Sequence, residues 1–226
     1  LKNKKIKQNN KKIDVVIKKT KNQSCSIFGS CLITNIKNQE SPKWLKDRLL
    51  AVGLRPISAV VDITNFIMLD LNRPLHAYDL DKINKRIIVR ESKKNERINA
   101  LDNKNYNLSD GMCVIADESG PLGLGGIIGG TSSSTEIDTK NIMLESAYFD
   151  PYLTRETSNI LNLNSDAKFR FERGIDPNSI ITGLQKAAEM IKEICGGEVG
   201  KFHLTKTKNF FTNQIQLDND FASKVL

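Results

Sequence analysis

The first half of the chain alternates between two hydrophobic patterns. The stretches 13–19 and 26–36 are rich in β-branched residues, which predicts two strands. A helix is expected to begin at Ser41-Pro42 and to end at Gly53, because serine is a common N-cap, proline suits the first helical position and glycine ends helices. The apolar face of this helix consists of Trp44, Leu45, Leu49, Leu50 and Val52.

The next segment, 58–71, is apolar enough to resemble a buried strand. Its hydrophobic positions recur at helical intervals, however, and this spacing favours a helix. The expected buried stripe is Val60, Val61, Thr64, Ile67, Met68 and Leu71, and the polar residues outside it are Asp62, Asn65, Asp70 and Asn72.

Short apolar runs separated by Asn, Asp, Gly and Ser fill the middle of the chain, which predicts a meandering sheet. The expected strands are 86–92, 96–101, 111–118, 122–130 and 141–149. Helices are expected from Asp150-Pro151 to about Leu161 and from Pro177 to the stop at Gly196-Gly197, followed by a short strand near 200–207. The predicted class is therefore α+β, with a mainly antiparallel or mixed sheet and flanking helices.

Charge is concentrated at the start of the chain. Residues 1–22 hold nine lysines and one aspartate, which accounts for the whole formal net charge of +8. This run suits either a solvated linker or an arm that contacts nucleic acid; residues 1–12, which lack periodicity, are interpreted as the linker. At the other end, Asp218 is a plausible cap for a helix that the terminus cuts off, so we expect an excised piece of a longer protein.

Several classes of protein are excluded by composition. Collagen-like, coiled-coil and disordered chains do not have this glycine, proline and hydrophobic content. No apolar stretch approaches 18 residues and no secretory signal precedes the first strand, which predicts a cytoplasmic protein without a membrane span. The four cysteines lack metal-ligand spacing, so we expect reduced, buried thiols and no metal site.

Two residues stand out as candidates for chemistry. His76, in a predicted turn, is suited either to a site or to a hydrogen-bonded place in the core. Glu145 interrupts an apolar strand on the face of Met143 and Ala147; if that face is buried, the carboxylate must bind something, and otherwise it lies at a wet edge. The glycine-rich run 120–130 suits close backbone packing or a ligand pocket equally well. The segment 165–177 indicates an amphipathic stretch with internal ion pairs.

Five ordered segments resemble the B3/B4 domain of bacterial-type phenylalanyl-tRNA synthetase β subunits. They are VVDITNF, NRPLHAYDLDKI, GLGGIIGG, NIMLESAYFDP and SDAKFRFERGIDP, and the resemblance covers about residues 23–205. It implies a domain at 23–207, a basic linker with a lead-in strand at 1–22, and the start of a B5-like domain at 208–226. It also implies post-transfer editing, in which tyrosine misattached to phenylalanine tRNA is hydrolysed while the α subunit carries aminoacylation.

The same resemblance implies roles for individual residues. Glu145 matches the residue that reads the tyrosine para-hydroxyl, and Gly129 and Ala167 match small residues that keep the pocket open. His76 matches a histidine near the ester, and the remaining matches, with catalytic or substrate-binding roles, are Thr64, Asn65, Ser165 and Pro74. A hydroxyl-reading second pocket is physically reasonable, because a hydrophobic pocket rejects an added hydroxyl by only about 10²-fold.

The implied partners are phenylalanine tRNA and the synthetase α subunit, in an α2β2 heterotetramer, with no DNA and no membrane. No cofactor is expected in this part, and ATP and magnesium are expected on other domains of the full synthetase. The alternative is a noncatalytic module that binds tRNA or braces the subunits and has an inactive pocket.

Overall fold

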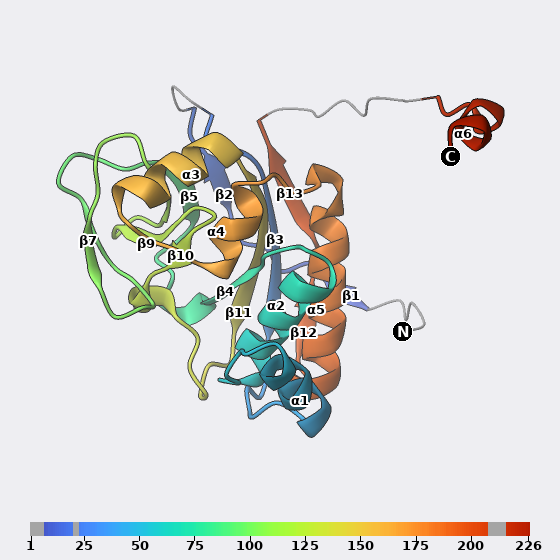
Figure 1. Ribbon diagram of the computed structural model, residues 1–226. Coiled ribbons are helices and arrows are strands. Elements are labelled where there is room, and N and C mark those ends of the chain that lie inside the picture. The colour runs from blue at the N-terminus through green and yellow to red at the C-terminus, as the bar shows by residue number, and fades with distance from the viewer. Residues whose placement is uncertain (1–6, 20–22, 208–215) are drawn as a thin grey trace.

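The computed structural model describes residues 7–19, 23–207 and 216–226, and its strands form two main sheets and a hairpin (Figure 1). The first sheet has the order β1-β12-β3-β11-β4, with β13 beside β3. Its strands are β1 (Gln8–Asn9), β3 (Cys25–Thr34), β4 (His76–Asp79), β11 (Ile142–Phe149), β12 (Glu198–Gly200) and β13 (His203–Lys206).

The second sheet has the order β10-β9-β8-β5-β2 and packs beside the first. Its strands are β2 (Val15–Ile17), β5 (Ile87–Glu91), β8 (Cys113–Ala116), β9 (Pro121–Leu124) and β10 (Ile128–Gly129), and the separate hairpin consists of β6 (Arg97–Asn99) and β7 (Asn105–Asn107). The pairs β1·β12 and β2·β5 are parallel, and the other pairs in the three sheets are antiparallel.

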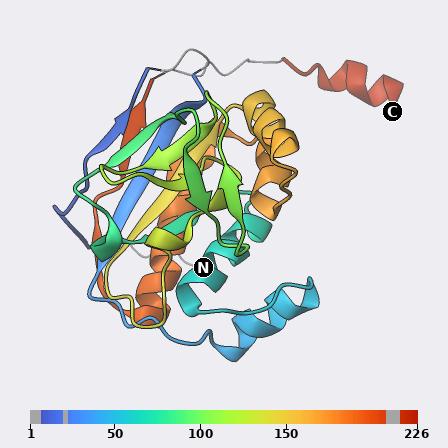
Figure 2. The same ribbon diagram turned by 90° about the vertical axis from the view of Figure 1, so that its left-hand side faces the viewer.

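Helices lie on the outside of these sheets. They are α1 (Lys43–Ala51), α2 (Ala59–Asp70), α3 (Pro151–Ile160), α4 (Asp166–Phe171), α5 (Ile180–Cys195) and α6 (Asn219–Val225), with short 3₁₀ turns η1 (Leu80–Lys82), η2 (Thr131–Ser133) and η3 (Pro177–Ser179). Figures 1 and 2 show α5 running along the first sheet, while α6 lies apart from the rest of the molecule. The predicted α+β class with a mixed sheet is confirmed.

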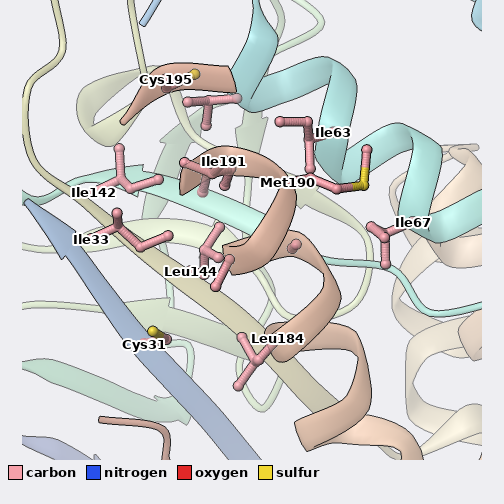
Figure 3. Close-up of a cluster of buried hydrophobic side chains, with 14 of the residues drawn as sticks. Cys31, Ile33, Ile63, Ile67, Ile142, Leu144, Leu184, Met190, Ile191 and Cys195 are labelled. Atoms are coloured by element: carbon pink, nitrogen blue, oxygen red, sulfur yellow. The ribbon is translucent and has the colours of Figure 1, made fainter. Parts of the chain in front are cut away.

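One hydrophobic core fills the space between the first sheet and helices α1, α2 and α5. Figure 3 shows Ile33 of β3 and Leu144 of β11 facing Ile63 of α2 and Ile191 of α5. These four side chains are completely buried. A buried aliphatic side chain contributes roughly 1.5–3 kcal/mol to folding, so this core fixes the positions of β3 and β11.

A second core lies between the two sheets. Successive residues of a strand point to opposite faces, so Met143 and Ala147 pack here while Leu144 packs in the first core. The second sheet contributes Ile87 and Ile115 to the same layer. Strand β11 therefore has no wet face, because both of its faces are covered.

Local capping rules predicted several helix ends correctly. Asp150 caps α3 by accepting a hydrogen bond from the Leu153 N–H, and Asp218 caps α6 in the same way. Gly196, at φ 73°, ends α5 as expected. At α1 the cap is Pro42 instead of Ser41, and the Ser41 hydroxyl donates to Asp62 Oδ2 at 2.6 Å.

Other predictions of local structure were wrong. The expected turn at His76 is strand β4, and the expected single strand at 122–130 is divided into β9 and β10. Asp62 is completely buried despite its predicted place outside the stripe, because its carboxylate accepts from Ser41 and from the Ile57 N–H. On α1, only Leu45 and Leu49 of the expected apolar face are buried.

The basic run also differs in part from the predicted linker. Residues 1–6 lie outside the described part of the chain, but Gln8–Asn9 form β1 and pair in parallel with β12. The Lys11 ammonium group donates to the Thr34 hydroxyl at 3.1 Å. At least this part of the run is attached to the first sheet.

Candidate functional site

Antiparallel pairing of β4 with β11 brings three polar side chains to one face of the first sheet. His76 stands directly opposite Glu145, and Tyr78 stands opposite Met143. Residues two apart on a strand share a face, so His76, Tyr78 and Glu145 all belong to the side that packs toward the second sheet. The register of β4 on β11 therefore determines which polar side chains meet at the site.

These side chains line a recess between the two sheets and helix α4. The recess is open to solvent and encloses about 460 Å³ of space not filled by atoms, including that opening. It brings together five of the expected residues, namely Pro74, His76, Gly129, Glu145 and Ala167. The wall is otherwise largely apolar and includes Leu75, Ile115, Leu124, Ile127, Ile128 and Phe171.

Glu145 is the buried acid of this recess, with 7% of its surface exposed. The Tyr78 hydroxyl donates to Glu145 Oε2 at 2.5 Å. Burial raises the pKa of the Glu145 carboxyl to about 7, against the lowering effect of the Tyr78 hydrogen bond. The alternative of an edge position on a wet face is wrong, because β11 lies between β3 and β4.

His76 lies edge-to-face against Tyr78, with ring centroids 4.4 Å apart. Its Nε2 atom is buried and has no hydrogen-bond partner among the described residues. Burial lowers the pKa of the imidazole to about 4, so the ring is neutral at neutral pH. A buried, unpartnered ring nitrogen is the property expected of a group that awaits a ligand or water.

The glycine-rich run forms the wall opposite His76. A Cβ atom added to Gly129 would lie 2.4 Å from His76 Cε1, closer than side-chain atoms approach one another. Gly126, another residue of this wall, has φ 73° and packs against the Phe149 ring. The glycine-rich run therefore combines its two predicted roles, close backbone packing and a ligand pocket, because the close packing also shapes the recess.

Helix α4 closes one side of the recess. Ser165 caps it: the hydroxyl accepts from the Lys168 N–H at 3.0 Å and donates to the Ile127 carbonyl at 2.6 Å. Ser165 itself does not line the recess, but its two hydrogen bonds connect α4 to the wall residue Ile127. Ala167 and Phe171 face the recess, whereas the predicted ion pairs of this segment, such as Lys168 with Glu172 at 2.9 Å, lie along the helix.

Two further expected residues do not line the recess. Thr64 and Asn65 belong to α2, whose buried residues pack in the first core, and neither residue lines the recess. The Thr64 hydroxyl donates to the Val61 carbonyl at 2.7 Å within its own helix. Their expected role near the reacting ester stays a prediction.

Tyr78 is the polar residue of the site that sequence reasoning missed. Position 78 lies two residues after His76, but the sequence predicts a turn for this segment, in which that spacing has no meaning. In a strand, period-2 alternation puts both side chains on one face.

The described part of the chain contains neither a candidate metal site nor a candidate membrane span. No group of three or more His, Cys, Asp or Glu side chains is arranged to hold a metal ion within residues 7–19, 23–207 and 216–226. Over the same ranges, no helix is long and apolar enough to cross a membrane. All four cysteines are free and buried.

Comparison with known proteins agrees with this architecture. The chain is 46% identical over 194 residues to the phenylalanine–tRNA ligase beta subunit of Paramagnetospirillum magneticum, and 44% identical over 173 residues to that of Wolbachia sp. subsp. Brugia malayi. These stretches cover 86% and 76% of the chain but only 24% and 22% of the relatives, so the chain spans about a quarter of their length.

A solved structure has a similar fold. It is an N-terminal fragment of the phenylalanyl-tRNA synthetase beta subunit from Pyrococcus horikoshii, with a TM-score of 0.60 at 12% identity, covering 98% of this chain and 62% of that one. The family described as the B3/4 domain matches residues 24–196, which include the whole recess. The chain therefore belongs to the B3/4 domain family.

Proposed function

We propose that this chain is part of the β subunit of a phenylalanine–tRNA ligase, and that its recess hydrolyses tyrosine misattached to phenylalanine tRNA. The observation that carries the proposal is the buried Glu145 carboxylate in a recess whose wall is otherwise largely apolar. An apolar wall accepts an aromatic ring, and a buried acceptor favours a ring that carries a hydroxyl donor. Phenylalanine would leave that acceptor unpaired, which is costly.

Each expected residue has a place in this scheme. Glu145 accepts the para-hydroxyl of the tyrosyl ring, and Gly129 and Ala167 leave space for that ring. His76, through neutral Nε2, accepts a hydrogen bond from the attacking water or from the terminal ribose, while Thr64 and Asn65 position water and substrate. Because its pKa is about 4, the imidazole is a weak base, which favours positioning over proton transfer.

Two further residues shape the proposed pocket. Pro74 fixes the backbone just before His76, since its ring restricts φ. Ser165 holds α4, and with it Ala167, against the recess wall through the Ile127 carbonyl.

The wider assignment follows from the family and its relatives. The proposed partners are phenylalanine tRNA and an α subunit in an α2β2 assembly, in the cytoplasm, with no DNA. ATP and magnesium would act on other domains, and no cofactor is proposed for this one. The proposed editing domain spans 23–207, preceded by a basic linker with its lead-in strand and followed by the start of a B5-like domain.

The test uses the assembled synthetase with the complete β subunit. Hydrolysis of Tyr-tRNA and Phe-tRNA, both on phenylalanine tRNA, is compared for the wild-type enzyme, Glu145→Ala and Ala167→Trp. Loss of a charged acceptor is expected to slow tyrosyl hydrolysis by about 10- to 100-fold. Ala167→Trp should block the pocket, and both variants should keep normal phenylalanine charging.

Glu40→Ala is the matched control, because Glu40 pairs with Lys46 at the surface, far outside the residues that line the recess. Unchanged tyrosyl hydrolysis in both pocket variants would refute the proposal. An assembly that binds tRNA but hydrolyses neither ester would instead support the noncatalytic alternative.

A further inference from the structure

A second polar residue, Tyr78, contacts the acid of the recess. Tyr78 is buried, with 2% of its surface exposed, and lies among the apolar residues between the two sheets. It is the cross-strand partner of Met143, so its ring must reach diagonally for the hydroxyl to meet Glu145. Among the described residues, Tyr78 is the hydrogen-bond donor to Glu145, and it engages one oxygen, Oε2.

We propose that Tyr78 is a positioning residue of the recess: its hydroxyl occupies Oε2 of Glu145, so that the carboxylate offers Oε1 to a ligand with a single hydroxyl donor. This inference rests on the proposed function and adds the group that sets its selectivity. A phenol supplies one O–H, which Oε1 can accept. A ring without a donor leaves Oε1 unpaired and desolvated.

A purely structural role explains less of what is seen at position 78. Phenylalanine would fill the same apolar space without a buried hydroxyl, and burying a hydroxyl is costly unless it has a partner. The partner here is the one acid of the recess, at a distance typical of a charge-assisted hydrogen bond. The hydroxyl therefore acts on the site through Glu145 and not through packing alone.

The other titratable groups around Glu145 do not supply a positive charge. His76 faces it from β4 and is neutral at neutral pH. The thiols of Cys25 on β3 and Cys113 on β8 interact with it electrostatically, and burial raises the pKa of both, so they are uncharged as well. The hydrogen bond from Tyr78 lowers the pKa of the Glu145 carboxyl and so favours its ionised form, which accepts hydrogen bonds.

The experiment replaces Tyr78 by Phe in the assembled synthetase. The rate of tyrosyl-tRNA hydrolysis, as kcat/KM, is measured between pH 5.5 and 9. Losing a hydrogen bond to a charged group should raise the midpoint of the Glu145-dependent limb by about one to two pH units. Hydrolysis should then fall about five- to fiftyfold at pH 7 and recover toward pH 9.

Two variants serve as controls. Tyr106→Phe removes a matched tyrosine–carboxylate hydrogen bond, to the exposed Asp102 at 2.6 Å, and should leave the pH profile unchanged. Glu145→Gln should remove the limb, and adding Tyr78→Phe to it should produce no further shift. A structural role for Tyr78 would lower activity equally at all pH values.

The pKa of the Glu145 carboxyl, followed by carbon-13 NMR in the chain itself, separates this inference from the proposed function. A higher pKa of the Glu145 carboxyl in Tyr78→Phe supports the proposed hydrogen bond from Tyr78 to the ionised carboxylate. If it rises while the wild-type synthetase hydrolyses neither ester, the positioning role stands and editing is refuted. An unchanged pKa together with an unchanged pH profile would overturn the inference.

Discussion

Gly129 lies so close to His76 that a Cβ atom at position 129 would stand 2.4 Å from the imidazole Cε1 and 2.7 Å from Nε2. The next nearest atom, Leu101 Cδ1, would be 3.1 Å away. Glycine is therefore required here by the imidazole and not by backbone strain. The Nε2 atom of this imidazole is buried and unpartnered among the described residues.

Gly129→Ala should consequently displace the His76 ring. A shift of about 1 Å in a positioned group can cost about 100-fold in rate, so tyrosyl hydrolysis should fall by one to two orders of magnitude, which a deacylation assay would measure. In a His76→Ala background the same change should add little, because the clashing atoms are gone. Equal activity of Gly129→Ala and wild type would contradict this account of the glycine.

The raised pKa of Glu145, about 7, also predicts how stability depends on pH. In the unfolded chain the carboxyl ionises near pH 4.3, whereas in the folded protein it keeps its proton until about pH 7. Ionisation of the unfolded state therefore progressively removes stability between these values as pH rises. Glu145→Gln should be more stable than wild type above pH 7, by on the order of 3 kcal/mol, and the difference should vanish below about pH 4. Urea unfolding at pH 4, 6 and 8 measures this, and a pH-independent difference would refute it.

The buried His76 side chain should make stability depend on pH in the opposite direction. Burial lowers the pKa of its imidazole from 6.5 to about 4, so the unfolded chain takes up the proton first as pH falls. Wild type should lose stability between about pH 6.5 and 4, and His76→Ala should lose less over that interval. In the assembled enzyme, His76→Ala should slow tyrosyl hydrolysis but keep the limb near pH 7 that belongs to Glu145. Loss of that limb in the variant would instead indicate proton transfer by His76.

Arg73 is completely buried and joins three segments of the chain. Its guanidinium donates to the Ala147 carbonyl at 3.1 Å, to the Ser179 hydroxyl and to the Asp176 carbonyl. Arg73→Lys should lower the free energy of unfolding by at least about 2 kcal/mol, because an ammonium group cannot reproduce the planar set of donors.

Arg86→Lys is the matched control for this change. Arg86 pairs with Glu118 at a half-exposed position, and surface ion pairs contribute only about 0–1 kcal/mol. Denaturant unfolding of the two variants should separate them clearly. Equal losses would show that the burial of Arg73 has no special energetic role.

The sequence by itself determined the elements whose signals are local. Asp150-Pro151 and Gly196 specified helix ends, because capping hydrogen bonds and positive φ involve only neighbouring residues. Alternation along β11 placed Glu145 with Met143 and Ala147, and that face is buried as one alternative required. The resemblance to a known family then identified five residues that line one recess.

Only the tertiary structure decided what surrounds those residues. Strand β4 could not be predicted from its own four residues. They form a strand because they pair with β11, and these partners lie more than sixty residues away in the sequence. The same pairing brings the Tyr78 hydroxyl to Glu145. Hydrogen bonds from Ser41 and from the Ile57 N–H hold the Asp62 carboxylate in a buried position that the sequence pattern did not predict. Electrostatics followed burial: the pKa values of His76 and Glu145 depart from their ordinary values because water is excluded, and exclusion of water belongs to the assembled fold.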